Sequence, residues 1–247
     1  MRLQVRMTTL ALSILFLVGC TLAEQGQLPG PSPEAPTSEP TVATLCANEV
    51  LPVVEGAWWE YAGESANGAF SRTTAILDVG SDAFQVELHV GEISSIETWR
   101  CSSDGLVQLQ SDGGPFSAVL SGPDGSVTIS TLSDEGVTFP PAFGVGDSWE
   151  QATLLSISSA EVSGQATLSY EFEVIQTETI TVPAGTFQAM RVEVAGEIES
   201  PLSGTTFEYD STEWFAPGVG LVRYEGHMPE GGDLSAVTYE LTAYSIP

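Results

Sequence analysis

Apolar and polar residues alternate with a period of two along much of this chain. In three runs, Val86–Val90, Tyr170–Val174 and Met190–Val194, every second residue is large and apolar, and the residues between are polar or charged. A fourth run, Val237–Ala243, shows the same pattern. This alternation is typical of strands with one buried face and one face in water. The pattern therefore predicts β-strands in all four segments.

Short clusters of turn-forming residues separate the strand-like runs. They include Asp104-Gly105, Asp112-Gly113-Gly114, Pro123-Asp124-Gly125, Pro183-Ala184-Gly185 and Pro217-Gly218. Such clusters favour tight turns between antiparallel strands. After the N-terminal apolar stretch, no segment has the spacing of an amphipathic helix. We therefore predict an all-β fold, an antiparallel meander that forms an open curved sheet or half-barrel.

Recurring tryptophan motifs suggest an internal duplication. Gly56-Ala57-Trp58-Trp59-Glu60 matches Gly146-Asp147-Ser148-Trp149-Glu150, and a tryptophan precedes Gly-Leu-Val by the same spacing in 99–107 and 214–222. These matches predict two related halves, 50–125 and 139–247. The alternative is that β-hairpins reuse turn glycines and core aromatics. In either case we expect four tryptophans in the core or lining an apolar cavity: Trp59, Trp99, Trp149 and Trp214.

The N-terminus combines two arginines, Arg2 and Arg6, with an apolar stretch at 10–18 and the sequence Leu17-Val18-Gly19-Cys20. The apolar stretch is much shorter than the roughly 20 residues of a membrane-spanning helix. The pattern resembles the signal peptide and lipobox of bacterial lipoproteins, which implies cleavage after residue 19. It also implies diacylglyceryl and further acyl chains such as palmitate on Cys20. Two or more chains anchor a protein stably. Ordinary secretion and an uncleaved anchor are the alternatives.

Residues 20–45 are expected to form a lipidated, disordered tether to a β-domain at 46–247. Five prolines fall between residues 29 and 40, among serine, threonine, glutamate and glycine, so little apolar surface can be buried. Export places Cys46 and Cys101 in an oxidising compartment, where a disulfide between them is expected. Two free buried thiols are the alternative.

The charge balance excludes one class of partner. The chain has 33 acidic residues, six basic residues and a formal net charge of −27. Nucleic-acid binding is excluded because phosphate contacts need lysine and arginine. The acidity favours a solvated surface, although cation binding by the acidic stretch at 193–213 is an alternative. No calcium-loop motif is present, so no metal site is assigned.

Catalytic motifs are absent from the sequence. It contains no G-x-S-x-G, H-E-x-x-H, C-x-x-C or phosphate-binding glycine loop, and its two histidines, His89 and His227, are expected at the surface. We therefore expect no enzyme activity and no cofactor. A carboxylate-based hydrolase remains a distant alternative.

Three segments together resemble a group of uncharacterised bacterial envelope lipoproteins. The segments are Phe143–Trp149, Val182–Val192 (V-P-A-G-T-F) and Trp214–Val222 (W-F-A-P-G-V-G-L-V), and they cover roughly 139–226. The group is similar in outline to LolA-type lipoprotein carriers, which implies a concave apolar face. The shared motifs are turns, so no catalytic residue follows from them.

These observations predict a membrane-tethered, extracytoplasmic lipoprotein that binds or scaffolds a component of the cell envelope. Its lipid would hold it on the cell membrane or outer membrane. An alternative is a carrier or sensor of a lipid or other apolar ligand, which would need a continuous apolar cavity.

Overall fold

The computed structural model describes residues 45–91, 93–110, 127–158, 163–200, 205–230 and 233–247. The expected signal peptide, Cys20 and the tether to residue 44 lie outside these ranges. The chain from Val42 to Pro247 forms one compact unit. Within the described ranges, no helix is long and apolar enough to cross a membrane.

Twelve strands build the described part of the fold, which contains no helix. They are β1 (Trp58–Ser65), β2 (Gly68–Val79), β3 (Ala83–Val90), β4 (Ile93–Ser102), β5 (Gly105–Leu109), β6 (Thr128–Gly136), β7 (Ser148–Ser158), β8 (Ser163–Val182), β9 (Gly185–Ser200), β10 (Thr205–Ala216), β11 (Gly220–Glu230) and β12 (Asp233–Ser245). The prediction of an all-β antiparallel fold is confirmed.

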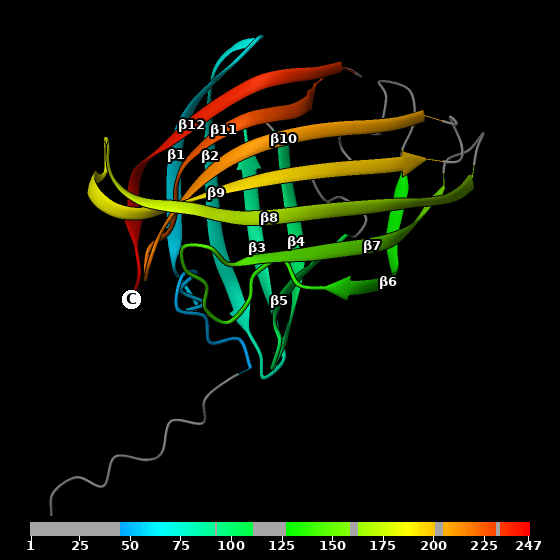
Figure 1. Ribbon diagram of the computed structural model, residues 1–247, viewed down its shortest axis with the longest axis horizontal. Helices are drawn as coiled ribbons and strands as arrows, with labels where there is room; N and C mark the ends of the chain where they lie inside the picture. The colour runs from blue at the N-terminus through cyan, green and yellow to red at the C-terminus, as the bar shows by residue number, and fades with distance from the viewer. Residues whose placement is uncertain (1–44, 92, 111–126, 159–162, 201–204, 231–232) are drawn as a thin grey trace, which may run out of the picture. The chain divides into compact units, whose positions relative to one another are not determined.

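All twelve strands belong to one sheet, ordered β5-β4-β3-β2-β1-β12-β11-β10-β9-β8-β7-β6. Two meanders, β1–β5 and β6–β12, are joined where β1 pairs with β12. The sheet curves into a nearly closed, barrel-like form, and its unsealed seam lies between β5 and β6. In Figure 1, β2–β4 stand behind β7–β10 and cross them steeply. The two layers enclose the inner face of the sheet.

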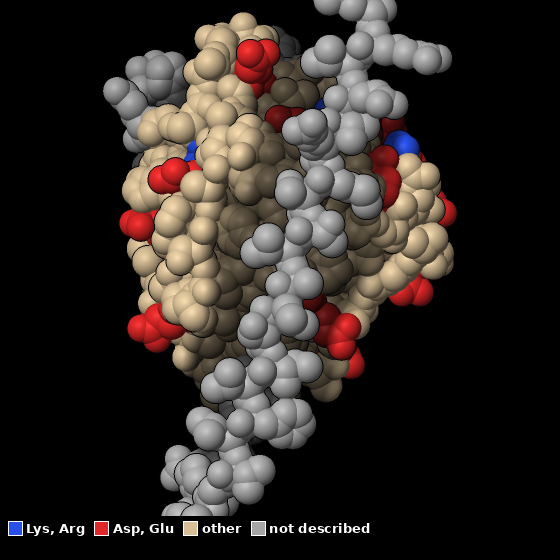
Figure 2. All heavy atoms as spheres, turned by 90° about the vertical axis from the view of Figure 1, so that its left-hand side faces the viewer, with Lys and Arg blue, Asp and Glu red and all other residues tan. Residues whose placement is uncertain are grey.

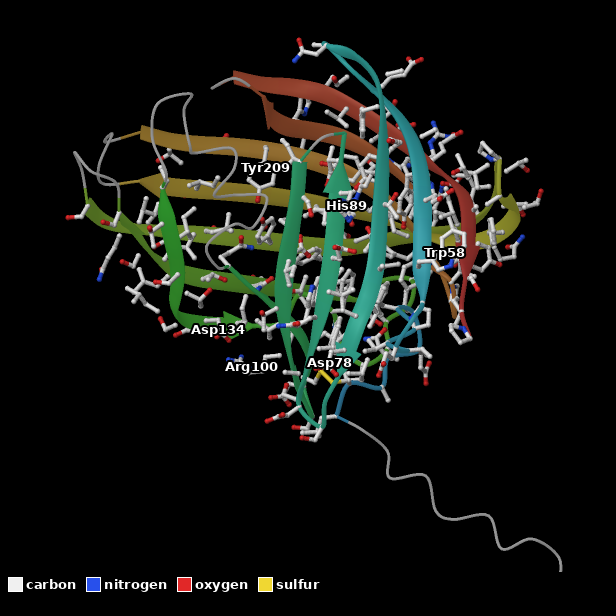
Figure 3. All side chains as sticks on the ribbon, turned by 180° about the vertical axis from the view of Figure 1, so that it is seen from behind. Trp58, Asp78, His89, Arg100, Asp134 and Tyr209 are labelled. Atoms are coloured by element: carbon white, nitrogen blue, oxygen red, sulfur yellow. A yellow bond between two sulfur atoms is a disulfide. The ribbon has the colours of Figure 1, made fainter. Side chains whose placement is uncertain are left out.

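Several contacts hold the seam together. The backbone N–H of Thr131 on β6 donates a hydrogen bond of 3.1 Å to the carbonyl of Gln110, directly after β5, and Thr138 bonds to Leu106 and Gln108. Leu106 and Phe139 exchange backbone hydrogen bonds of 2.8 and 3.0 Å, which link β5 to the segment after β6. Arg100 on β4 forms a two-pronged ion pair with Asp134 on β6. Figure 3 shows these two side chains beside each other at the seam. The sheet is therefore fastened across the gap by a few contacts rather than by a continuous ladder.

The alternation seen in the sequence places the large apolar residues inside the curve. Buried side chains form three clusters, which we call the first cluster (around Trp59, Trp99 and Leu241), the second cluster (around Phe172, Val192 and Phe215) and the third cluster (around Ile129, Leu155 and Leu168). Burial of this apolar surface drives folding. The expected alternation ends before Ala243, because the pairing of β1 with β12 shifts register between Glu60 and Tyr61.

A disulfide links Cys46 to Cys101, with a Cα–Cα distance of 4.9 Å. Both cysteines are buried in the first cluster. The bond attaches the segment before β1 to the C-terminal end of β4. It therefore holds the chain at its entry into the β-domain against the strand that lies next to the edge strand β5.

Candidate functional site

The inner face of the sheet carries three charged side chains in positions where the pattern calls for apolar ones. Arg72 on β2 pairs with buried Tyr61, and Glu97 on β4 pairs with buried Val86. Glu213 on β10 pairs with buried Val192 on β9. Cross-strand partners share a face, so all three charged residues point inward. We call Arg72, Glu97 and Glu213 the inner charged cluster.

The guanidinium of Arg72 is held mainly by tyrosines. It donates a hydrogen bond of 2.8 Å to the phenol oxygen of Tyr239. Its carbon lies 5.0 Å from the ring centre of Tyr239 and 6.0 Å from that of Tyr61, within the range of cation–π contacts. Its Nε is buried and has no hydrogen-bond partner. A guanidinium has five N–H donors, so Arg72 keeps donors beyond the one that Tyr239 accepts.

Arg72 faces the two glutamates without forming an ion pair with them. Among the described residues, no carboxylate oxygen lies within 4.0 Å of an Arg72 nitrogen, the limit for a salt bridge. Burial alone would lower the pKa of Arg72, but Tyr239, Tyr61 and the two glutamates outweigh burial and raise that pKa. Arg72 is therefore a fixed positive charge on the inner face.

Both glutamates hold their protons more tightly than ordinary carboxyl groups. Burial raises the pKa of Glu97, although Arg72 and hydrogen bonds from Trp99 and Gln108 oppose the shift. Burial also raises the pKa of Glu213 to about 7, against a hydrogen bond from Ser211 and the charge of Arg72. Glu97 is 8% exposed and Glu213 is partly buried. Near neutral pH, Glu213 is poised between its protonated and ionised forms.

Phenol rings surround the inner charged cluster. Tyr224 stacks on Tyr239 with ring centres 4.7 Å apart, and Tyr61 meets Tyr239 edge-on at 5.4 Å. A second pair, Tyr170 and Tyr209, is hydrogen-bonded with ring centres 5.7 Å apart. Figure 3 shows Tyr209 on the inside of the curved sheet. Burial raises the pKa of each of the five phenols, so they are neutral at physiological pH.

Two glycines let aromatic rings lie flat against the inner face. A Cβ on Gly196 would lie 2.2 Å from Cζ of Tyr209, and a Cβ on Gly63 would lie 2.5 Å from Cζ of Phe70. Real side chains never approach so closely, so any other residue at either position would push the ring away. The rings therefore lie close to the sheet, and two of the three charged residues, Arg72 and Glu213, are partly accessible.

Some local features recur in the two segments that the sequence predicts as related halves. The turns before β1 and β7 make the same pair of backbone hydrogen bonds, and the register of the next hairpin shifts at similar points, after Ile76 and after Val174. The bonds are Gly56 N to Ile76 O (3.0 Å) and Ile76 N to Ala57 O (2.8 Å), and Gly146 N to Val174 O (2.9 Å) and Val174 N to Asp147 O (2.9 Å).

The two inner glutamates occupy matching places in these halves. Ser95-Ile96-Glu97 on β4 corresponds to Ser211-Thr212-Glu213 on β10, and both serines are buried. If the two segments are instead aligned so that Trp99 matches Trp214, the matched side chains lie on opposite faces of the sheet. Trp99 points inward, whereas Trp214 points outward beneath Arg223. A register shift between Trp214 and Phe215 accounts for the one-residue offset.

The four tryptophans expected in the core or a cavity lie apart from one another. Trp59, Trp99 and Trp214 are buried, and Trp149 is partly buried against Phe172. Each indole N–H has its own acceptor: Val219 O for Trp59, Glu97 Oε2 for Trp99, Thr138 O for Trp149 and Glu178 Oε1 for Trp214. They therefore act as separate anchors of the sheet, and only Trp99 touches the inner charged cluster.

Two shallow hollows of about 490 and 500 Å³ include none of Arg72, Glu97 and Glu213 in their lining, although Tyr209 lines the second. The first lies between the β8–β9 hairpin and the β10–β11 turn, around Phe187, Met190 and Pro217. The second is lined by acidic residues of β8–β10, including Glu197 and Glu208. Neither contains a tryptophan. In the described ranges no three acidic, histidine or cysteine side chains gather as a metal site.

The other three arginines of the described chain each pair with an acidic side chain. Arg100 binds Asp134, Arg191 binds Glu193, and Arg223 binds Glu225 and lies 3.7 Å from Glu240. Figure 2 shows one face of the protein, with acidic side chains around its rim and very little basic surface. His89 and His227 are exposed beside Glu87 and Asp210. The outer surface is therefore dominated by negative charge.

One family model matches part of this chain. Residues 138–237, less than half of the chain, match the DUF3108-like family model. No curated protein matches.

The solved structures that are similar to this chain include three bacterial proteins. One is a Bacteroides fragilis protein named as exported, with a YmcC-like fold (20% identity, 81% of this chain, 100% of that chain, TM-score 0.49). Another is a Parabacteroides distasonis protein named as a lipoprotein (20% identity, 81% and 99%, TM-score 0.46). The third is the hypothetical lipoprotein YmcC of Escherichia coli (13% identity, 77% and 85%, TM-score 0.38).

Proposed function

We propose that this protein is a lipid-anchored, extracytoplasmic, non-catalytic binding module whose ligand site is the inner charged cluster. The lipobox ending at Cys20 and the proline-rich tether support the location. The disulfide between Cys46 and Cys101 fits an oxidising compartment. The lipid on Cys20 would anchor the protein to the membrane, and the ligand would be a component of the envelope.

The observation that carries this proposal is the partly accessible Arg72, which has unfilled hydrogen-bond donors. Three charged groups on the inner face cost stability that apolar residues of similar size would not cost. A barrel that served only as a scaffold would gain from an entirely apolar interior. A binding site needs these groups because buried polar contacts select one ligand over others.

A purely apolar cargo fits this interior poorly. The carrier alternative requires a continuous apolar cavity, but the inner charged cluster and its five tyrosines lie among the apolar clusters. Tyr170 and Tyr209 contact the third cluster, so polar and apolar surfaces adjoin there. A ligand with both a polar and an apolar part matches this face better than a hydrocarbon alone.

Mass spectrometry under native and denaturing conditions tests the proposal. We expect the mature chain carrying Cys20→Ala, purified from a bacterial envelope, to hold a small molecule that denaturation releases. Arg72→Met should abolish this bound mass, whereas Arg191→Met, which alters an arginine outside the inner face, should keep it. Circular dichroism would establish that both variants are folded. A bound mass unchanged by Arg72→Met would overturn the inner-face site.

One feature of the inner charged cluster favours the hydrolase alternative. Two carboxyl groups with raised pKa on one face, one of them near 7, are the pattern expected for an acid paired with a base or nucleophile. A screen of glycoside substrates would decide it. Turnover by the wild type that Glu213→Gln abolishes would establish hydrolysis, and equal activity in both proteins would refute a role for Glu213.

A further inference from the structure

The inner charged cluster is unbalanced in charge. Arg72 contributes one positive charge, and Glu97 and Glu213 contribute two negative charges when both are ionised. The titratable side chains packed around them from β1, β8, β10, β11 and β12 are Tyr61, Tyr170, Tyr209, Tyr224 and Tyr239, all neutral phenols. With both glutamates ionised, the cluster therefore has a net charge of one negative unit. Because the pKa of Glu213 is raised, a proton on Glu213 can neutralise that charge.

Ligands with a single kind of charge match the cluster poorly. An anion would satisfy the free N–H donors of Arg72 but would be repelled by the two carboxylates. A cation would balance the glutamates and lie against tyrosine rings, a favourable contact, but would be repelled by Arg72 and leave its donors unfilled. A group with both charges side by side satisfies all three residues, because each charge finds an opposite one.

We infer that the inner charged cluster binds a zwitterionic group, with a primary ammonium at Glu97 and Glu213 and an adjacent phosphate or carboxylate on Arg72. This inference rests on the binding function proposed above and names the chemistry of the ligand. The outer surface agrees with it. Since the three outer arginines are paired with acids, the protein repels anionic molecules but not zwitterionic ones, which carry no net charge.

The zwitterion has two sources, the headgroup of a lipid such as phosphatidylethanolamine or a free small molecule. The surroundings of Tyr170 and Tyr209 bear on this choice. Both rings pack against the third cluster, whose buried members come from β6, β7 and β8. A lipid whose headgroup binds at Arg72 would meet apolar surface there, whereas a free molecule would gain nothing from it.

Calorimetric titration of the mature chain carrying Cys20→Ala tests the inference with five soluble probes. They are the glycerol diester of phosphoethanolamine, which carries one charge of each sign and is called phosphoethanolamine below, ethanolamine, inorganic phosphate, and short-chain phosphatidylethanolamine and phosphatidylglycerol below their micelle concentrations. We expect phosphoethanolamine to bind at least tenfold more tightly than ethanolamine or phosphate. Titrations at pH 6.5 in two buffers of different ionisation enthalpy should show proton release, because the ammonium replaces the proton on Glu213.

Matched variants place the binding on the inner face. Arg72→Met and the nearly isosteric Glu213→Gln should each weaken phosphoethanolamine binding at least tenfold. Arg191→Met and Glu171→Gln, both outside the inner face, should leave it unchanged. Tighter binding of the short-chain lipid than of phosphoethanolamine would identify a lipid headgroup, and equal affinities would identify a free zwitterion.

The result that overturns the inference differs from the result that overturns the binding function. If phosphate alone or ethanolamine alone binds as tightly as phosphoethanolamine, and Arg72→Met abolishes that binding, the zwitterion is wrong but the inner-face site stands. If short-chain phosphatidylglycerol equals phosphatidylethanolamine, the ammonium plays no part and the inference fails. If neither Arg72→Met nor Glu213→Gln changes the affinity of any probe that binds, the inner-face site fails as well.

Discussion

Arg72 on β2 and Tyr239 on β12 are joined by a hydrogen bond of 2.8 Å although they lie 167 positions apart in the sequence. They meet because both strands flank β1, where Tyr61 and Gly63 are their register partners. Tyr239→Phe would keep the ring contacts and remove only the acceptor. We expect it to lower the free energy of unfolding by about 1–3 kcal/mol, since a charged donor then lacks its partner.

Urea unfolding monitored by fluorescence would measure this loss. Tyr244→Phe is the matched control, because Tyr244 is also on β12 but is 37% exposed. It should change the free energy of unfolding by no more than about 0.5 kcal/mol. Equal effects of the two substitutions would mean that the Tyr239 hydroxyl does not hold Arg72.

Glu213 should make the protein less stable as the pH rises from about 4.5 to about 7. Its pKa is raised from 4.5 to about 7 in the folded protein, chiefly by burial. In this window the folded protein holds a proton that the unfolded chain has lost, so the free energy of unfolding falls with rising pH. Glu213→Gln removes this contribution and should stabilise the protein above pH 7 by roughly 1–3 kcal/mol.

Urea unfolding at several pH values would show this difference. Glu171→Gln serves as the control, since Glu171 is exposed on β8 and lies on the outer face. Its substitution should leave the slope of stability against pH unchanged in that window. Parallel curves for the wild type and Glu213→Gln would contradict the raised pKa.

The sequence predicted the strands because burial on one face leaves a period of two, as in Val86–Val90 on β3 and Met190–Val194 on β9. The sequence also contained a signal for the candidate site. At a few positions, a charged residue stands where the residues two places before and after it point inward. Phe70-x-Arg72-x-Thr74 and Ser95-x-Glu97-x-Trp99 are two such breaks. Of the three charged residues, only Glu213 falls within the acidic stretch at 193–213 that the sequence offers as an alternative cation site.

What the sequence could not show was that these breaks come together. Arg72, Glu97 and Glu213 become neighbours only because β1 pairs with β12, which closes the sheet on itself. Alternation within a strand specifies a face but not the partner strand. The raised pKa values follow from that closure, since they arise from burial inside the curve.

The seam should loosen when its ion pair is removed. Asp134→Asn would leave Arg100, whose side chain is 46% exposed, without its charged partner on β6. Because the Asp134 side chain is only 9% exposed, its charged hydrogen bonds are worth more than those of an exposed pair, and we expect a loss of about 1–3 kcal/mol in the free energy of unfolding. Amide hydrogen exchange in β5 should quicken as well, because the seam is held by separate bonds rather than by a continuous ladder.

Hydrogen exchange measured by mass spectrometry on peptides covering residues 105–109 would test this. Asp78→Asn is the control, since Asp78 lies exposed on β2 and makes no ion pair among the described residues (Figure 3). It should leave exchange in β5 as in the wild type. Unchanged exchange in Asp134→Asn would show that the hydrogen bonds at Leu106, Gln108 and Gln110 hold the seam without the ion pair.

Loss of the disulfide should destabilise the domain. The bond joins residues 55 positions apart, for which loop closure in the unfolded chain is worth about 4 kcal/mol. We expect the double substitution Cys46→Ser and Cys101→Ser to lower the free energy of unfolding by up to that amount. Urea unfolding with and without reductant gives the comparison. A wild type equally stable in both conditions would contradict this role.

The lipobox predicts where the protein is found. Cys20→Ala should move the protein from the membrane fraction to the soluble extracytoplasmic fraction, because the lipid is lost while the β-domain is untouched. Fractionation followed by immunoblotting would show this, with circular dichroism of the soluble product to confirm its β content. A variant that stays in the membrane fraction would show that another part of the chain provides the anchor.

The pairing of β1 with β12 also sets the order of events when the chain is made. β1 is the first strand to be synthesised and β12 is the last, yet each is the other's neighbour in the sheet. The inner face therefore cannot be enclosed until residues 233–245 have been made. Until then β1–β5 has an open edge, and Arg72 and Glu213 do not face each other. The candidate site is thus completed only by the final strand of the chain.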